Sequence, residues 1–117
     1  MSRNFMSKND ELRRGGLTGP NNGEWKAVFQ DDGNFVVYGW EPVWNSSTAG
    51  SDQTLRLCMQ ADCNLVMYNK DNEPKWHTNS AKSGCNMCRL HLTDQGKLVL
   101  FRECETIWTS ANSSGVK

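Results

Sequence analysis

The stretch QDDGNFVVY, Gln30 to Tyr38, returns thirty residues later as QADCNLVMY, Gln60 to Tyr68. Gln, Asp, Asn, Val and Tyr are kept at every second position of the two copies. Because alternate side chains of a strand point to the same face, this chain contains the same polar face twice. A third and more distant copy is LTDQGKLVLF, which ends at Phe101. The copies predict an internal repeat, and a repeat determines the whole fold.

A second signature follows each copy and sets the length of the repeat. The followers are EPVW, EPKW and ETIW, which place three tryptophans at identical 32-residue intervals: Trp44, Trp76 and Trp108. Equal spacing predicts a pseudo-threefold body with these tryptophans in its core. We expect Trp25 to join that core and Trp40 to be partly exposed near the first copy. The 117 residues suit one domain, residues 1–117, with repeats at about 17–48, 49–80 and 81–112.

The residues that precede each copy also alternate. Apolar side chains stand at every second position, as a half-buried strand requires: Trp25, Ala27 and Phe29, then Leu55, Leu57 and Met59, then Cys88, Leu90 and Leu92. Each repeat is therefore predicted to be a small antiparallel β-meander, and the fold to be all-β. The segments SSTAGSDQ and SANSSGVK are interpreted as loops or loose ends.

Composition excludes several partners. Thirteen basic residues balance thirteen acidic ones, so no long-range field favours nucleic acid or an anionic membrane. No apolar run is long enough to span a bilayer, which predicts no membrane insertion. The start, MSRNFMSKNDELRRGG, lacks the apolar middle of a secretory signal. We expect a neutral or locally recognised ligand.

The pair Asp32-Gly33 predicts a hairpin turn in the first copy. A three-residue loop with Gly33 in the left-handed region would place Gln30 opposite Asn34. The apolar face then makes core, and the polar face makes a compact site of a carboxylate, two amides and a phenol beside one aliphatic group. In the second copy Cys63 stands where Gly33 does, so the turn there is less certain.

Such a cluster offers donors and acceptors at fixed spacing, which suits a polyhydroxylated neutral ligand such as a sugar. The alternative is an ordinary solvated strand face. That alternative does not explain five matching positions in two repeats, with valine on the polar side both times.

These residues resemble the mannose-binding QxDxNxVxY motif of the bulb-type, snowdrop-like lectins, and the whole chain resembles the lily-type lectins of fish skin and mucus. The resemblance implies a β-prism II fold of three four-stranded antiparallel sheets. By the same resemblance, Asp32 and Asn34 take the axial 2-hydroxyl of mannose, Gln30 the 3-hydroxyl and Tyr38 the 4-hydroxyl, while Val36 contacts the ring. The second site repeats these roles with Asp62, Asn64, Gln60, Tyr68 and Val66.

The third copy departs from the motif at all but its valine, since it holds Thr93, Gln95, Lys97, Val99 and Phe101. We therefore predict no mannose binding there.

The five cysteines leave at least one unpaired. Cys63 and Cys88 both lie on core parity, and the resemblance implies a disulfide between them, while Cys58, Cys85 and Cys104 are left unassigned. A zinc site from Cys85, Cys88, His91 and either Cys63 or Cys104 is the weaker alternative, and no metal or other cofactor is expected. No nucleophile motif accompanies either histidine, so the protein is not expected to be an enzyme.

The sequence thus predicts a mannose-specific lectin with two intact sites and a role in innate or mucosal defence. Its partners would be mannose-containing glycans and a second copy of itself, since the resemblance implies a dimer made by strand exchange around Thr109 to Val116. It would act outside the cell, in mucus or at a surface, by a signal-independent route, with a cytoplasmic location as the alternative. The rival function is a β-prism that binds proteins through decayed sugar sites.

Overall fold

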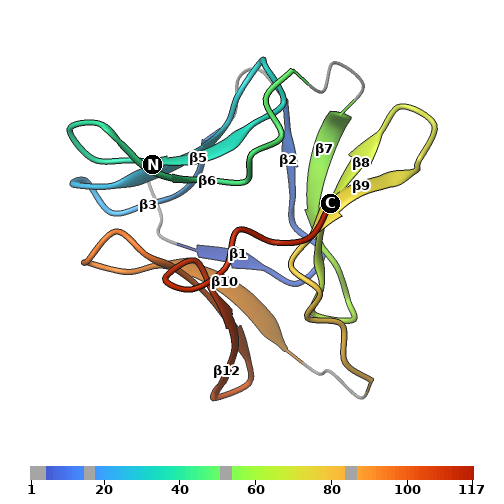
Figure 1. Ribbon diagram of the computed structural model, residues 1–117. Helices are drawn as coiled ribbons and strands as arrows, with labels where there is room; N and C mark the ends of the chain where they lie inside the picture. The colour runs from blue at the N-terminus through green and yellow to red at the C-terminus, as the bar shows by residue number, and fades with distance from the viewer. Residues whose placement is uncertain (1–4, 15–17, 51–53, 84–86) are drawn as a thin grey trace.

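The computed structural model describes residues 5–14, 18–50, 54–83 and 87–117. They form three four-stranded antiparallel sheets, arranged around a common centre with pseudo-threefold symmetry (Figure 1). The first-repeat sheet contains β3 (Thr18–Asn21), β4 (Lys26–Phe29), β5 (Phe35–Tyr38) and β6 (Pro42–Asn45). None of the described residues belongs to a helix, so none could cross a bilayer as one.

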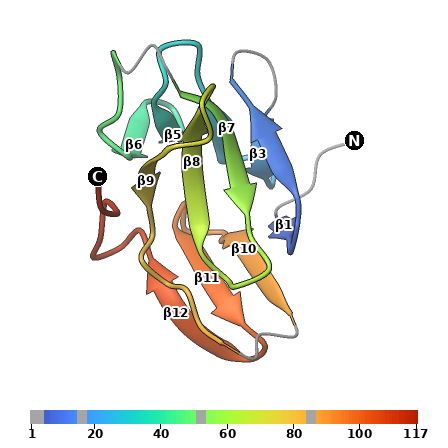
Figure 2. The ribbon, with the colours of Figure 1, turned by 90° about the vertical axis from the view of Figure 1, so that its right-hand side faces the viewer.

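The other two sheets each combine one repeat with a strand from the start of the chain. The second-repeat sheet has the order β2 (Glu11–Arg13), β7 (Thr54–Met59), β8 (Leu65–Asn69), β9 (Pro74–His77). Figure 2 faces this sheet, with β7 and β8 side by side. The third-repeat sheet has the order β1 (Phe5–Ser7), β10 (Cys88–Leu92), β11 (Leu98–Arg102), β12 (Glu105–Thr109). The β-prism expectation is confirmed, and the N-terminal strands complete meanders that hold three strands each.

The core lies where alternation places it. Side chains on the inner face of the central hairpin strands are almost fully buried: Ala27, Phe29, Phe35, Val37, Leu57, Met59, Leu65, Met67, Leu90, Leu92, Leu98 and Leu100. Burying a large aliphatic side chain contributes about 1.5–3 kcal/mol, so these residues fix the register of every hairpin. One expectation is wrong: Leu55 is exposed, because a register irregularity between Thr54 and Arg56 puts Thr54 inside instead.

The three repeat tryptophans meet at the centre of the prism. Trp44 packs edge to face against both Trp76 and Trp108, with ring centroids 6.4 and 5.8 Å apart. Their core role is confirmed. Trp25 packs against the edge of the core, and its indole N–H donates to the carbonyl of Asp94 at 3.1 Å. Trp40, by contrast, is fully exposed.

The C-terminal tail is not a loose end. It crosses the centre of the molecule to β9 (Figure 1) and satisfies all three repeat indoles. The N–H groups of Trp44 and Trp76 donate to the carbonyls of Ser113 and Ser114 at 2.9 and 2.8 Å, and that of Trp108 donates to Ser113 Oγ at 3.0 Å. Buried indole N–H groups need such partners. The tail therefore belongs to the fold, which the loop interpretation missed.

Candidate functional site

The three repeat hairpins turn in the same way. In the first, the backbone N–H of Gln30 donates to the backbone carbonyl of Asn34 at 2.9 Å, and the backbone N–H of Gly33 donates to the carbonyl of Gln30 at 3.1 Å. Gly33 has φ 85°, as the three-residue loop requires. In the second, Cys63 adopts the same region at φ 72° and makes the equivalent bond to Gln60 at 3.1 Å. A non-glycine residue there costs about 1–2 kcal/mol, yet the turn is kept.

The turns bring the Asp and Asn of each motif together. Asp32 Oδ1 accepts a hydrogen bond from the backbone N–H of Asn34 at 3.0 Å, and Asp62 does the same for Asn64 at 3.1 Å. These are local Asx-type bonds that hold a carboxylate beside an amide. Both carboxylates are exposed, so each keeps acceptor capacity for a ligand.

The first and last motif residues are also joined. Gln30 Nε2 donates to the hydroxyl oxygen of Tyr38, and Gln60 Nε2 donates to that of Tyr68. Because the phenol accepts in this bond, its own O–H proton can be donated to a ligand. The predicted pairing of the two strands across the hairpin thus brings all five motif positions into one cluster, twice.

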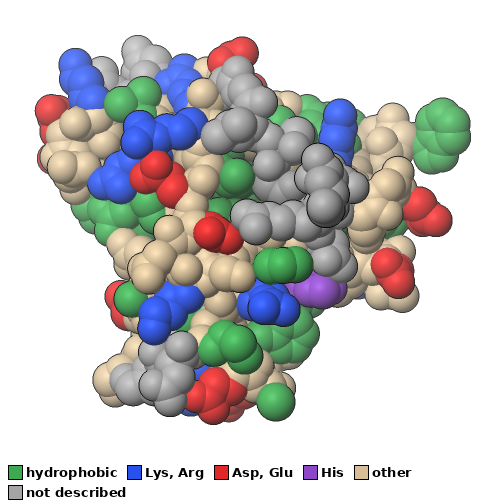
Figure 3. Space-filling model, turned by 180° about the vertical axis from the view of Figure 1, so that it is seen from behind, with side chains coloured by type: hydrophobic (Ala, Val, Ile, Leu, Met, Phe, Trp, Pro, Cys, Tyr) green, Lys and Arg blue, Asp and Glu red, His purple; other side chains and the backbone are tan. Residues whose placement is uncertain are grey.

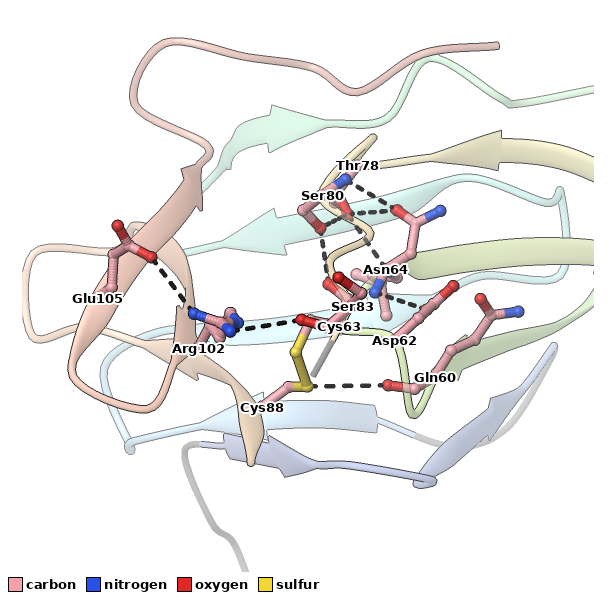
Figure 4. Close-up of a disulfide and its surroundings, with 11 residues drawn as sticks. Gln60, Asp62, Cys63, Asn64, Thr78, Ser80, Ser83, Cys88, Arg102 and Glu105 are labelled. Atoms are coloured by element: carbon pink, nitrogen blue, oxygen red, sulfur yellow. Dashed lines mark hydrogen bonds and ion pairs between the residues drawn. A yellow bond between two sulfur atoms is a disulfide. The ribbon is translucent and has the colours of Figure 1, made fainter. Parts of the chain in front are cut away.

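A pair of buried hydroxyl groups lies behind each cluster, and the sequence pattern did not predict them. Asn64 Oδ1 accepts from Thr78 Oγ1 at 3.2 Å and from the backbone of Ser80 at 3.1 Å, as Figure 4 shows. The two hydroxyls also contact each other at 2.7 Å. With its oxygen held from behind, the Asn64 side chain must turn its NH₂ group outward. The amide is therefore oriented as a donor.

The first repeat builds the same support from different residues. Ser46 Oγ and the backbone of Thr48 both donate to Asn34 Oδ1 at 3.1 Å, and the two hydroxyls lie 2.7 Å apart. The available signal was a hydroxyl residue two and four positions after the tryptophan of each of the first two repeats. In the third repeat Ser110 keeps the first of these positions and Asn112 replaces the second.

The second cluster opens into a hollow of about 330 Å³. Four of the five motif residues line it, with Asp62 left outside the lining: Gln60, Asn64, Val66 and Tyr68, together with Pro74, Lys75, Trp76, His77 and Lys117. Val66 is only 3% exposed, so it forms the floor of the hollow and not a projecting contact. Val36 is equally buried in the first repeat.

The two clusters also differ at the position that pairs with the motif valine. His77 stands where the first repeat has Asn45, since each residue pairs with the motif valine across the sheet. His77 Nδ1 lies 3.2 Å from Asn64 Nδ2 and accepts the backbone N–H of Asn79 at 3.2 Å. The backbone of His77 pairs with Val116 of the tail. The second site therefore depends on the C-terminal tail, through Val116 and Lys117.

The third repeat has the same turn without the cluster. Gly96 has φ 78° and donates to the carbonyl of Thr93 at 3.0 Å. The Thr93 hydroxyl is occupied by the backbone N–H groups of Gln95 and Lys97 at 3.3 and 3.2 Å. Phe101 packs edge to face against His91, 6.4 Å between centroids. The outer face here offers neither the carboxylate nor the phenol of the other repeats.

The cysteines follow the pairing that the resemblance implied. Cys63 and Cys88 form a disulfide, S–S 2.07 Å, which ties the second hairpin to the third-repeat sheet (Figure 4). The disulfide removes Cys88 from both versions of the zinc alternative and Cys63 from one of them. Cys58 and Cys104 carry free thiols, and burial raises the pKa of the Cys58 thiol. Cys85 lies outside the described residues.

Charges are dispersed over the surface. Figure 3 shows acidic and basic side chains interspersed on one face of the molecule. This matches the net charge of zero and leaves recognition to local hydrogen bonds. Among the described residues, no group of three or more His, Cys, Asp and Glu side chains is placed to hold a metal ion.

Comparison with known proteins identifies a relative over nearly the whole chain. The chain is 62% identical over 114 residues to the B-type lectin plumieribetin of Scorpaena plumieri, covering 97% of this chain and 100% of that protein. No profile of a known protein family matches the chain.

Two solved structures share the fold. A monomeric monocot mannose-binding lectin from Gastrodia elata superposes with a TM-score of 0.81 at 26% identity, covering 94% of this chain and 96% of that one. The mannose-specific agglutinin of snowdrop, Galanthus nivalis, complexed with methyl α-D-mannoside, gives a TM-score of 0.75 at 29% identity. It covers 84% of this chain and 88% of its own.

Proposed function

Because the chain belongs to the B-type lectin family, a family of non-enzymatic proteins, we propose that it is a mannose-binding lectin with two sugar sites. The observation that carries this proposal is the duplicated cluster, in which the same hydrogen bonds orient the same donors and acceptors in two repeats. The mannoside complex of the snowdrop agglutinin, which has the same fold, supports mannose as the ligand.

The first proposed site consists of Gln30, Asp32, Asn34, Val36 and Tyr38, and the second of Gln60, Asp62, Asn64, Val66 and Tyr68. In each, the carboxylate accepts from a sugar hydroxyl while the outward amide of the asparagine donates to one. The tyrosine hydroxyl supplies a further donor, and the valine floor lies against ring carbons. A site built around an axial hydroxyl rejects the equatorial epimer, since its polar groups would be left unpaired.

The third repeat is proposed to bind no mannose, because Thr93 already accepts two backbone bonds and Phe101 carries no hydroxyl. Two weak sites on one molecule gain apparent affinity on a multivalent glycan. We place this activity in defence outside the cell, in mucus or at a surface. That location rests on the resemblance alone.

A dimer would strengthen the multivalent effect. The described tail satisfies its own chain's tryptophans and pairs with its own β9, so strand exchange would have to reproduce these contacts between two copies. Sedimentation over a range of concentrations distinguishes the exchanged dimer from a monomer, which is the state of the Gastrodia elata lectin.

Calorimetric titration with methyl α-mannoside and methyl α-glucoside tests the proposed function. Heat of binding with the mannoside and none with the glucoside is the expected result. If neither sugar binds at millimolar concentrations, the lectin proposal fails and the protein-binding alternative replaces it.

A further inference from the structure

The outer face of the second-repeat sheet carries another hollow beside the proposed mannose site. Its volume is about 340 Å³. It is lined by the turn before β2 and the start of β2, by β7 and the hairpin turn that follows it, and by Tyr68 of β8: Asn9, Asp10, Glu11, Arg56, Cys58, Met59, Gln60, Ala61 and Tyr68. Gln60 and Tyr68 line both hollows. The hydrogen-bonded Gln60–Tyr68 pair is therefore a shared wall, and not the outer limit of the site.

The two hollows follow each other across the sheet. The mannose site lies over β8 and β9, and the second hollow lies over β7 and β2. Neighbouring strands are about 4.8 Å apart, so the centres of the two hollows are separated by roughly 10 Å. That distance suits a glycan of a few linked sugars, with one residue in each hollow.

The wall of the second hollow offers mixed hydrogen-bonding groups in a fixed arrangement. The Arg56 guanidinium lies over the Tyr68 ring, 4.8 Å from its centroid, and donates to Glu11 Oε1 at 3.2 Å and to Asn72 Oδ1 at 2.6 Å. It also lies 3.4 Å from Cys58 Sγ. A guanidinium has five N–H donors and a carboxylate about four acceptor positions, so both groups can also serve sugar hydroxyls.

The electrostatics of this hollow favour a neutral residue. Burial raises the pKa of Glu11, but hydrogen bonds from Arg56 and Arg13 outweigh that effect and leave it below its ordinary value. The carboxylate thus stays charged beside the Arg56 cation, and Asp10 adds another acidic group to the lining. An anionic sugar would face these carboxylates, whereas a neutral hexose meets paired donors and acceptors.

The described side chains of the other repeats do not reproduce this combination. In the first repeat Lys26 and Val28 replace Arg56 and Cys58, as the pairing with Tyr38 and Val36 shows. In the third repeat a hollow of about 290 Å³ occupies the corresponding place, and Arg89 stands where the second repeat has Arg56. Its other lining residues differ, since they are Met87, His91, Phe101, Glu103 and Cys104, and the adjoining motif has lost its tyrosine. Among the residues that the structure describes, an intact motif adjoins a polar hollow of this kind in the second repeat.

We propose that this hollow is a second sugar subsite, which binds the neutral residue linked to a mannose held in the second site. The inference rests on the proposed function and deepens it: the first site recognises a single mannose, whereas the second recognises a short mannose-containing oligosaccharide. The two sites of one molecule therefore differ in the ligand that they select.

The test isolates each site and compares monosaccharide with disaccharides. Asp32→Ala leaves the second site, and Asp62→Ala leaves the first. Each variant is titrated with methyl α-mannoside and with α1-2, α1-3 and α1-6 mannobiosides. One or two added hydrogen bonds predict that at least one mannobioside binds the second site about five- to thirtyfold more tightly than the monosaccharide. The first site should show a ratio near one.

Filling the hollow provides the matched control. Cys58→Phe in the Asp32→Ala background should bring the mannobioside ratio down to about one, while the equivalent Val28→Phe in the Asp62→Ala background should leave the first-site ratio where it was. Glu11→Gln provides a second variant in case Cys58→Phe does not fold. The inference is wrong if no mannobioside exceeds methyl α-mannoside at the second site, or if the preference survives both variants. Absence of methyl α-mannoside binding would instead overturn the proposed function itself.

Discussion

The hairpins of the second and third repeats have the same backbone turn, but their outer faces share only the valine of the motif. Cys63 and Gly96 both occupy the left-handed region, at φ 72° and 78°, and the inner side chains of both hairpins are fully buried. On the outer face, the asparagine that buried hydroxyls hold in place becomes Lys97, and the tyrosine becomes Phe101. Core side chains therefore preserve the fold while the outer face is free to gain or lose a sugar site.

Moving one outer residue from the third repeat into the second should have the largest effect. Asn64→Lys removes the outward amide and leaves the Thr78 and Ser80 donors without their acceptor. We expect second-site affinity for methyl α-mannoside to fall by more than about a hundredfold, as for the loss of two or more hydrogen bonds at a polar site.

The reverse exchange sharpens the comparison. Lys97→Asn should create no site in the third repeat, since Thr93, Gln95 and Phe101 remain. Calorimetry of Asn64→Lys in the Asp32→Ala background measures the loss of binding at the second site. Calorimetry of Lys97→Asn in the Asp32→Ala, Asp62→Ala double variant tests for binding in the third repeat. Mannose binding by Lys97→Asn in that double variant would show that a single side chain decides whether the outer face of a repeat binds mannose.

Removing the disulfide between these repeats should have the next largest effect. Cys63 and Cys88 are 25 residues apart, and closing such a loop stabilises the folded chain by about 3–4 kcal/mol. The variant Cys63→Gly with Cys88→Ala should lose less, about 2–3 kcal/mol, because glycine relieves the cost of the left-handed turn. Urea unfolding measures the difference, and a loss as large as the full disulfide value would mean that Cys63 bears no backbone cost.

A smaller effect is expected from the hydroxyl behind Asn64. Thr78→Val keeps the shape and removes one donor to Asn64 and one partner of Ser80. We expect a loss of about 1–3 kcal/mol in stability and a weakening of second-site binding with little change at the first site. Ser110→Ala, the equivalent change behind the empty third face, should affect stability alone. Equal effects of the two variants on mannose binding would refute a positioning role for Thr78.

The smallest effect concerns pH and the Arg56–Glu11 pair. The folded-state pKa of Glu11 is below its ordinary value of 4.5, so its contribution to stability is complete above that value and is lost as the pH falls through the folded pKa. An exposed pair contributes little. The acid side of the stability profile should therefore move slightly in Glu11→Gln. In the third-repeat sheet Phe5, opposite His91, stands where the second-repeat sheet has Glu11. An acid stability profile that is the same in Glu11→Gln and in the wild type would show that the Arg56–Glu11 pair adds nothing to stability.

The sequence predicted the fold correctly wherever side chains alternate strictly between the two faces of a strand. Alternation correctly placed Phe29, Phe35 and the disulfide cysteines inside, and the Asp-Gly turn predicted the hairpin that gathers the first motif. Parity failed at Leu55, where a register irregularity reverses the face. It also gave no sign that the hydroxyls of Thr48 and Ser80 turn inward, because polar residues in short loops usually face solvent.

Contacts between segments that are far apart in the sequence could not be predicted from the alternation of apolar residues. Strands β1 and β2 are three residues each, too short for alternation to distinguish them from a loop. The tail residues Ser113 and Ser114 are polar and irregular in sequence, yet they satisfy the buried indoles. His77 lies beside Asn64 because the pairing of β8 with β9 puts His77 opposite Val66. Contacts of this kind depend on the assembled prism and not on local periodicity.

The stoichiometry of methyl α-mannoside binding tests the central claim most directly. Calorimetry on the whole chain should give two sites per molecule, one each for Asp32→Ala and Asp62→Ala, and none for the double variant, with Gln95→Ala unchanged from the wild type. A single site in the wild type, or binding that survives in the double variant, would contradict the assignment of one mannose site to each of the first two repeats.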